Sequence, residues 1–271
     1  MVSNLLEADV ENVLNVAFSA DDEELLVVDP SAETIVSLIE AAADRDDLPA
    51  LSMLVDERTV KDVMEDFLVA SKAADLVADG ALSLRLLATD VDNALFVSGS
   101  QVVVLVSSGD RVAALSTDDE KFVDTVFETH RAAFEAAEPF TLRTPPISRV
   151  RETMATEIGA ATRDDFDAML AALGSARGDD DGLDEVTVSL LVAAKNDVLL
   201  YDISKWGEDV GIASKATFSR TKTRLEDMGI IDTEKVPIDV GRPRLRLKLG
   251  DERFHGADAA EIASIAADIV R

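Results

Sequence analysis

VLLYDISKWGEDVGIASKATFSRTKTRLEDMGII, residues 198–231, is the stretch that decides the fold of the C-terminal third of this chain. Its pattern predicts a helix over 201–209, a tight turn at Gly211 and a second helix over 215–228 with Ser214 as its N-cap. A helix over 184–197 precedes it, and a strand and a basic wing over 232–249 follow. This order is typical of a winged helix-turn-helix, whose second helix enters the major groove of DNA.

The helix over 215–228 has two different faces. Phe218, Leu225 and Met228 fall near one face and are expected to pack on the two preceding helices. The other face is polar and basic, and a recognition helix presents its N-terminal half to base edges. The expected base contacts are Ser214, Lys215, Thr217 and Arg220, the expected phosphate contacts are Lys222 and Arg224, and Lys205 joins them from the preceding helix.

The wing alternates apolar and basic residues. Because side chains alternate along a strand, one face should be core and the other wholly basic. The apolar residues are Leu245, Leu247 and Leu249, and the basic ones are Arg244, Arg246 and Lys248. Gly241-Arg242-Pro243 suits the tip of an arm lying along the backbone or in the minor groove, where narrow grooves attract arginine. Arg242, Arg244 and Arg246 are the wing residues expected to contact DNA.

Charge singles out the same region. Residues 201–255 hold 11 Lys+Arg and 10 Asp+Glu, a balance of +1, whereas the other 216 residues hold 15 and 44, a balance of −29. A basic strand is also typical of a merely solvated face, and some winged helices serve only protein–protein contacts. Against so acidic a background, basic residues on two adjacent elements favour DNA as the partner.

The net charge of −28 indicates the setting in which the protein folds. Such acidity with few aromatic residues can accompany disorder, but 47% of the residues are hydrophobic and fall into periodic runs. Carboxylate repulsion is screened in molar salt, where the Debye length is about 3 Å. The composition therefore predicts a folded protein adapted to high salt.

Length and residue usage exclude several classes. A chain of 271 residues favours two domains. The absence of cysteine excludes disulfides, thiolate metal sites and cysteine nucleophiles. No apolar run approaches the roughly 20 residues of a membrane span, and the N-terminus lacks the pattern of a signal peptide. We therefore expect a cytoplasmic protein with no membrane partner.

The N-terminal half alternates strand and helix patterns, which predicts an α/β domain with a mixed, mainly parallel sheet. The expected helices cover 5–18, 31–45 with Ser31 as cap, 57–78 and 118–137. The expected strands cover 24–30, 51–55 and 82–88, then a hairpin of 94–98 and 101–107 across Gly99, and a further strand at 111–115.

Thr144-Pro145-Pro146 is the sharpest helix breaker and marks the expected domain boundary. Helices predicted within 147–174 and over 257–270 have apolar faces that either pair two copies or fold back onto their own chain. The expected division is a sensor-like α/β domain over 1–145, a helical connector and linker over 146–182, the winged helix over 183–256 and a terminal helix over 257–271.

No pattern in the chain predicts catalysis or a metal site. It has no phosphate-binding Gly-x4-Gly-Lys loop and no Gly-x-Gly-x-x-Gly after a strand. Asp179-Asp180-Asp181-Gly182 does not fit a calcium loop, because Arg177 would occupy the first ligand position. His130 is expected to be a surface or half-buried helix residue, and we expect no cofactor.

Three segments carry a resemblance to a known family: 148–153 (SRVRET), 199–207 (LLYDISKWG) and 214–231. Over nearly its full length, the chain resembles the TbsP-type haloarchaeal transcription regulators. The resemblance implies promoter binding and control of central-carbon genes. The N-terminal region is distantly similar to the sensor domain of TrmB-type regulators, which is related to the phospholipase D fold, although the domain order is reversed and no sugar-binding residue is carried over. Neither His130 nor His255 begins the His-x-Lys-x4-Asp motif of phospholipase D chemistry.

The hypothesis is a sequence-specific transcription regulator that binds double-stranded promoter DNA as a homodimer, biased by an effector-sensing N-terminal domain. A small molecule would bind at the carboxyl ends of the strands, although each candidate there also fits a cap or a turn. These candidates are Asp29, Ser31, Asp56, Thr89 and Asp90. The alternatives are simple dimerisation for the N-terminal domain, and for the whole chain an interaction protein whose winged helix binds another regulator.

Overall fold

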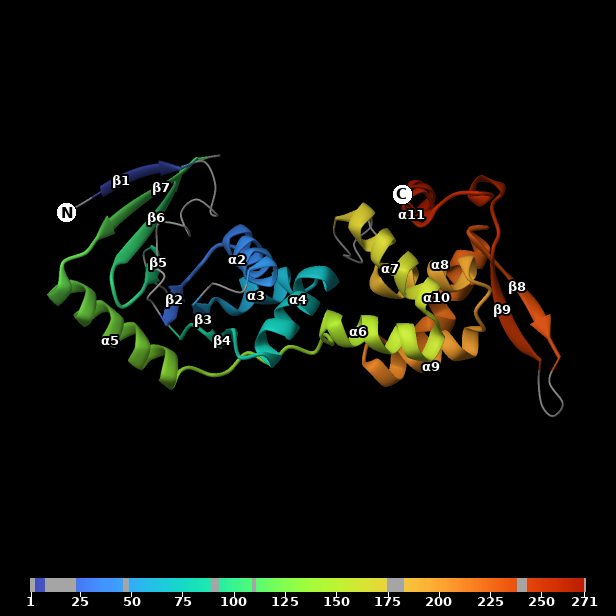
Figure 1. The fold of residues 1–271 in the computed structure, drawn as a ribbon, viewed down its shortest axis with the longest axis horizontal. Coiled ribbons are helices and arrows are strands. Elements are labelled where there is room, and N and C mark those ends of the chain that lie inside the picture. The colour runs from blue at the N-terminus through green and yellow to red at the C-terminus, as the bar shows by residue number, and fades with distance from the viewer. Residues whose placement is uncertain are drawn as a thin grey trace. The chain divides into compact units, whose positions relative to one another are not determined.

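A computed structural model describes residues 3–7, 23–45, 49–88, 93–108, 111–174, 183–237 and 243–270 (Figure 1). Its contacts divide the chain into two compact units. The first comprises Met1–Met64 and Lys72–Leu142, and the second comprises Glu65–Ser71 and Arg143–Arg271. Each unit is described by itself.

The first unit contains a seven-stranded sheet of order β1-β7-β6-β5-β2-β3-β4. The strands are β1 (Ser3–Glu7), β2 (Glu24–Val28), β3 (Ala50–Val55), β4 (Leu82–Leu86), β5 (Ala94–Val97), β6 (Val102–Ser108) and β7 (Arg111–Thr117). The expected α/β class and the hairpin across Gly99 are confirmed, with Val97 opposite Val102. Parallel pairing is confined to β2–β3 and β3–β4, whereas the other four pairings are antiparallel, so the meander is a larger part of the sheet than we expected.

Helices cover both faces of the parallel part of this sheet. They are α2 (Ala32–Asp44), α3 (Glu57–Val63), α4 (Phe67–Ala78) and α5 (Glu120–Ala136), and Figure 1 shows α5 on the face opposite α2 and α3. Leu26 and Val28 of β2 pack with Val123 and Phe134 of α5. The alternate residues Leu25 and Val27 are also fully buried, so both faces of the strand are covered. This explains why β2 is an unbroken apolar run.

Two predictions for this unit were wrong. Residues 5–7 belong to the edge strand β1 and not to an opening helix, because they pair with β7. The rest of the predicted helix, 8–18, lies outside the described residues. The predicted helix over 57–78 is broken after α3. There the Asp66 carboxylate accepts a hydrogen bond from the Leu68 backbone N–H at 2.9 Å and starts α4 as an N-cap does.

The second unit is mostly helical. It holds α6 (Ile147–Thr153), a π-helical turn (Met154–Ile158), α7 (Ala160–Leu173), α8 (Glu185–Lys195), α9 (Leu200–Val210), α10 (Lys215–Asp227), the hairpin β8 (Ile231–Val236) and β9 (Arg244–Leu249), a short 3-10 turn (Glu252–Phe254) and α11 (Ala259–Val270). The predicted winged helix-turn-helix is therefore confirmed, with α8, α9 and α10 as its three helices.

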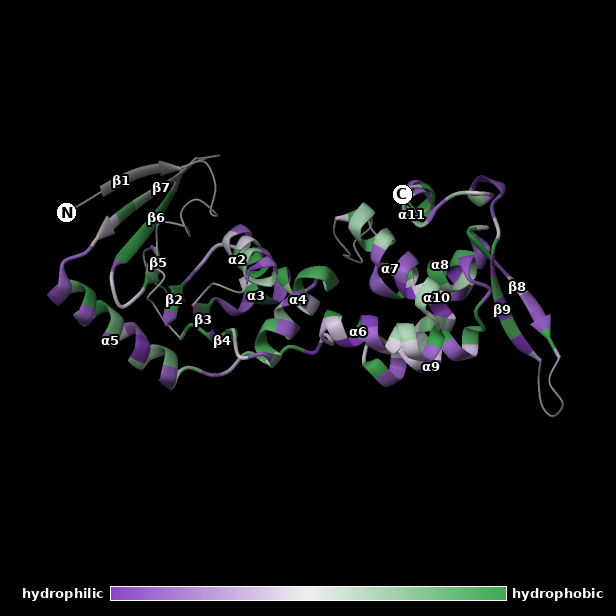
Figure 2. Cartoon of the chain, viewed as in Figure 1, coloured by the Kyte–Doolittle hydropathy of each residue, from purple (hydrophilic) through white to green (hydrophobic). Residues whose placement is uncertain are grey.

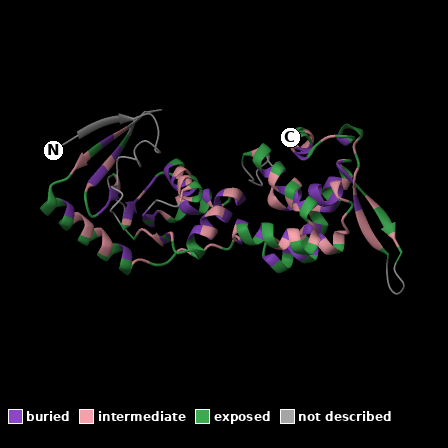
Figure 3. Cartoon of the chain, in the orientation of Figure 1, coloured by how far each residue is buried: buried purple, intermediate pink, exposed green. Residues whose placement is uncertain are grey.

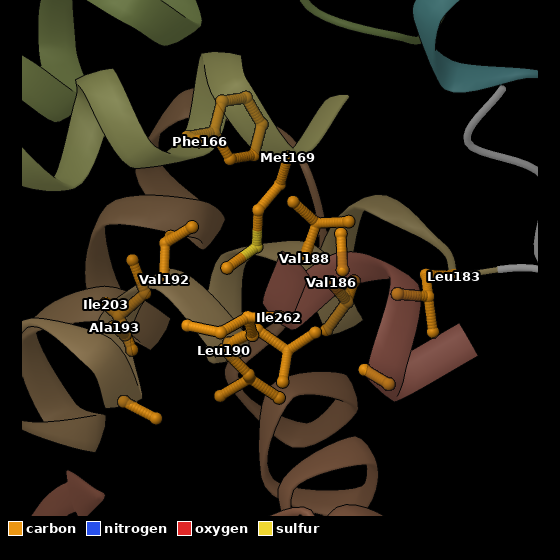
Figure 4. Close-up of a cluster of buried hydrophobic side chains, with 14 of the residues drawn as sticks. Phe166, Met169, Leu183, Val186, Val188, Leu190, Val192, Ala193, Ile203 and Ile262 are labelled. Atoms are coloured by element: carbon orange, nitrogen blue, oxygen red, sulfur yellow. The ribbon is translucent and has the colours of Figure 1, made fainter. Parts of the chain in front are cut away.

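One hydrophobic core unites this second unit. Helix α8 lies in its middle and is buried at every position from Val186 to Ala194 (Figure 4). Phe166 and Met169 of α7 and Ile262 of α11 belong to the same core. The apolar faces of the predicted helices 147–174 and 257–270 thus fold back onto their own chain and are not left free to pair two copies.

Candidate nucleic-acid interface

The turn between α9 and α10 is fixed by two local interactions. Gly211 ends α9 with φ +98°, a left-handed backbone that favours glycine, and its N–H donates to the Gly207 carbonyl at 3.2 Å. Ser214 caps α10, because its Oγ accepts a hydrogen bond from the Thr217 backbone N–H at 3.2 Å. Both roles predicted from the sequence are confirmed.

A glycine lets α9 and α10 approach closely. A Cβ added at Gly207 would lie 2.3 Å and 2.4 Å from two ring carbons of Phe218. The Phe218 ring is fully buried, and so is Leu225, about two helical turns later on the same face of α10. Gly207 therefore sets the distance at which α10 packs, and with it the position of the exposed face of α10.

The exposed face of α10 carries polar and basic groups. Lys215, Ser219 and Arg220 are exposed, and Thr217 is half-exposed. Ser214 Oγ and Thr217 Oγ1 lie 3.0 Å apart, and Arg220 Nη2 donates to Thr217 Oγ1 at 3.4 Å. Three of the four predicted base contacts, Ser214, Thr217 and Arg220, are therefore linked by side-chain hydrogen bonds over the first two turns of the helix, and the fourth, Lys215, is exposed on the first turn.

Two basic residues further along α10 have intramolecular partners. Lys222 is only 9% exposed, and its Nζ lies 2.6 Å from Glu226 Oε2. Glu226 also accepts a hydrogen bond from Thr233 Oγ1 at 2.8 Å, so the Glu226 carboxylate connects α10 to β8. Lys222 was predicted to contact a phosphate, but its side chain lies on the inner side of α10. Arg224 is exposed and donates from Nη2 to Thr187 Oγ1 at 3.3 Å.

The wing is joined to the start of α9. Strands β8 and β9 pair antiparallel, and the Leu247 N–H donates to the Val198 carbonyl at 3.0 Å. Figures 2 and 3 show hydrophilic residues along β8 and more exposure there than along β9. Leu247 is fully buried, whereas Leu245 and Leu249 are half-buried. Arg242, expected at the tip, lies outside the described residues.

Each basic side chain of β9 has an acidic neighbour. Arg244 Nη1 lies 3.5 Å from Asp202 Oδ1, and the guanidinium carbon lies 4.3 Å from the centroid of the Tyr201 ring, a cation–π contact. Arg246 Nη1 lies 3.7 Å from Glu234 Oε2, and Lys248 Nζ lies 2.6 Å from Asp197 Oδ1.

The lysines of the helix-turn-helix are paired in the same way. Lys205 bonds to Asp209, and Lys215 bonds to Glu208. The hydrogen bond from Lys215 holds the pKa of Glu208 below its usual value, and the bond to Glu208 raises the pKa of Lys215. Within the part of the chain that the structure describes, Arg220 has no acidic partner. Arg224 has none there either, but Arg220 lies in the first two turns of α10, beside Thr217.

A hollow of about 390 Å³ lies between α9, α10 and the wing. Among the residues that line it are Tyr201, Ser204 and Ser219. Sequence reasoning did not select these three. Tyr201 is the only tyrosine of the chain and is 46% exposed at the start of α9. An aromatic residue beside a predicted recognition helix is the sequence signal that could have identified it.

The candidate sensing residues of the first unit serve local roles. Ser31 caps α2, accepting from the Thr34 N–H at 3.3 Å. Asp56 caps α3, and the hydrogen bonds from Thr59 and Arg58 hold its pKa below the usual value. Asp29 has φ +50° at the end of β2. Thr89 and Asp90 lie outside the described residues.

Across the ranges that the structure describes, no group of three or more acidic or histidine side chains could hold a metal ion. Nor does any helix in those ranges have the length and apolar character needed to cross a membrane.

Comparisons with known proteins agree with this architecture. The family model "Transcriptional regulator TbsP-like, N-terminal" matches residues 2–145, and "Transcriptional regulator TbsP-like, C-terminal HTH domain" matches residues 146–267. A comparison with curated proteins gives no match.

Two solved structures are similar to parts of the chain. One is TrmBL2, an archaeal chromatin protein whose structure shows a novel mode of DNA binding. It shares 19% sequence identity with this chain at a TM-score of 0.38. The match covers 51% of this chain and 54% of TrmBL2, so this chain spans about half the length of TrmBL2. The other is a phospholipase D family member, Nuc from Salmonella typhimurium, with 11% identity, a TM-score of 0.34 and coverage of 52% and 99%. At these TM-scores neither likeness carries a functional argument. On the two family models, which together span residues 2–267, the chain belongs to the TbsP-like transcriptional regulators, a family of regulators with a C-terminal helix-turn-helix domain and not of enzymes.

Proposed function

We propose that the protein reads specific sequences in double-stranded promoter DNA through α10 and its wing. The observation that carries this proposal is the exposed surface of Ser214, Lys215, Thr217 and Arg220 on α10. Lys215 of this surface lines the same hollow as Arg244 of the wing. An α-helix fits the major groove, where an arginine can pair with two acceptors of one guanine. Arg220 is assigned that role because it lies in the N-terminal half of α10, which a recognition helix presents to base edges, and because no carboxylate pairs with it among the described residues.

The paired cations act differently in this proposal. Lys205, Arg244 and Arg246 follow the phosphate backbone, and Arg224 supports them from the second half of α10. Each of the first three must exchange a carboxylate for a phosphate when DNA binds. Lys222 is left out of the DNA contacts because it is buried, and Arg242 stays a predicted contact of the wing tip.

The acidic composition supports operation in molar salt. Counterion release contributes little to affinity there, so hydrogen bonds to bases and shape must supply more of the binding energy. The same proposal includes a domain division at residues 145–146, a regulatory role for the α/β domain and a cytoplasmic location. The family resemblance supports central-carbon genes as the targets. Binding as a homodimer would match palindromic half-sites one helical turn apart.

The test is selection of bound duplexes from a random pool at molar potassium chloride, followed by occupancy mapping in a high-salt host. The variant is Arg220→Ala, and Arg58→Ala is the matched control, because Arg58 is an exposed arginine of the other unit. We expect one enriched motif for wild type and for Arg58→Ala, and loss of preference at about one base pair, worth about 1–3 kcal/mol, for Arg220→Ala.

The rival hypothesis is an interaction protein whose winged helix binds another regulator. It predicts no enriched motif in the purified system, together with promoter occupancy that survives Arg220→Ala in cells. That combination would overturn the proposal.

A further inference from the structure

Helix α5 covers only part of its side of the sheet. Its buried residues Val123 and Phe134 pack over β2 and β5. The strip formed by β6 and β7 continues the same face, since Val104 is paired with Leu115 and Val102 with Thr117. Leu115 is 44% exposed and Phe122 at the start of α5 is 52% exposed. Apolar side chains therefore line a hollow at the edge of α5.

The hollow has a volume of about 330 Å³. Val104, Leu115 and Thr117 come from the sheet, and Phe122, Val126 and His130 come from α5. None of its nine lining residues is charged, although 54 of the 271 residues of the chain are Asp or Glu. In so acidic a protein, an uncharged hollow with an apolar wall is a distinct chemical environment.

His130 supplies the polar end of the hollow. It is half-buried, and no hydrogen bond joins its ring to another residue in the described part of the chain. Burial lowers the pKa of the imidazole and so favours the neutral ring, which offers one N–H donor and one acceptor nitrogen. The hydroxyl-bearing residue Thr117 lines the same space.

We propose that this hollow binds a small, uncharged aromatic molecule that carries one hydrogen-bonding group. The aromatic part would contact Leu115, Phe122 and Val126, and its polar group would bond to His130. Ligand sites begin at about 300 Å³ and are mostly apolar with a few polar groups, and this hollow meets both conditions. At about 30 Å³ per water molecule its volume accommodates roughly ten non-hydrogen atoms, too few for a helix or a second copy of the chain.

Of the residues first considered for an effector at the carboxyl ends of the strands, the three that the structure describes, Asp29, Ser31 and Asp56, do not line this hollow. Binding at the site concerns the α/β domain alone. Only its use as an effector site rests on the proposed function, so binding is measured without DNA.

The probes are a matched pair, 4-fluorophenol and 4-fluorotoluene, in which a hydroxyl replaces a methyl group. Each is titrated with the full-length chain at molar potassium chloride, and binding is followed by the fluorine NMR signal. Leu115→Trp places an indole in the hollow at an exposed position, and Val77→Trp, at a valine 42% exposed elsewhere, is the control. His130→Phe removes the polar group and keeps a ring.

We expect saturable millimolar binding of 4-fluorophenol to wild type and to Val77→Trp. Leu115→Trp should weaken it about tenfold or more, because the indole fills the space. His130→Phe should abolish the preference for 4-fluorophenol over 4-fluorotoluene. Absence of saturable binding, or binding that Leu115→Trp leaves unchanged, would overturn the proposal. So would a concentration-dependent dimer that Leu115→Trp dissociates while neither probe binds, because the patch would then be a protein interface.

Discussion

Replacing Gly207 by alanine tests the packing that positions the recognition helix. The new methyl would lie 2.3 Å and 2.4 Å from two ring carbons of Phe218. To reach a relaxed carbon contact of roughly 3.5 Å, the ring and helix α9 must separate by about 1.2 Å. The ring cannot simply turn away, because Phe218 is fully buried among the residues of the core.

Two opposing terms set the expected free energy of unfolding. Alanine is favoured over glycine inside a helix by about 1 kcal/mol, so helix propensity alone predicts stabilisation. Overpacking a core costs about 1–3 kcal/mol, and a contact this short belongs at or above the upper end of that range. We therefore expect Gly207→Ala to destabilise the winged-helix unit by about 2 kcal/mol, a fall in Tm of about 4–8 °C.

The assay uses the intrinsic fluorescence of Trp206. It is the only tryptophan of the chain, lies beside Gly207 and is 1% exposed, so its emission reports unfolding of this unit alone. Urea titrations at constant salt give the free energy of unfolding. In a Phe218→Leu background, which removes the two ring carbons, the same alanine should cost nothing or should stabilise. A higher Tm for Gly207→Ala in the wild-type background would refute the packing argument.

Three further predictions follow from the second unit. Glu208→Gln releases Lys215 from its carboxylate, so DNA affinity should rise. The slope of log K against log salt should also steepen by about 1, because one more cation releases a counterion from DNA. An unchanged slope in filter-binding titrations would mean that Lys215 does not contact DNA. Burial raises the pKa of Glu185 to about 7, above the usual 4.5, so the native state holds a proton that the unfolded state loses. The free energy of unfolding should therefore fall as pH rises from about 4.5 to about 7. Glu185→Gln should flatten that part of the pH profile, measured by urea titration. Ser214→Ala removes the N-cap of α10 and should cost about 1 kcal/mol in the Trp206 assay, whereas Ser214→Asp should restore most of it because aspartate also caps; equal losses for both would argue against a capping role.

The winged helix was predictable because its signals are local. Ser214 as cap, Gly211 as left-handed turn and Leu247 as buried wing residue each depend on a few neighbouring residues. The strands of the first unit were predictable for a similar reason, since short apolar runs bounded by breakers are typical of buried strands.

Other features depend on distant partners and left no local signal. Residues 5–7 form a strand only because β7 offers an edge over a hundred residues away. Lys222 follows a helical pattern that suggests exposure, but its side chain is buried and pairs with Glu226, which Thr233 of β8 holds by a hydrogen bond. The carboxylates that occupy Arg244 and Lys248 come from residues 202 and 197, and no spacing rule in the sequence connects them.

The carboxylates paired with the basic residues have a consequence for how this regulator evolves. Asp202, Asp209 and Glu234 each pair with a cation that is proposed to follow the phosphate backbone, and none of these cations belongs to the α10 surface proposed to read bases. Exchanging one of these carboxylates for a neutral residue changes how strongly any duplex is held and leaves untouched the side chains that choose among sequences. Single substitutions at these acidic positions would therefore retune occupancy while the same set of operators is kept.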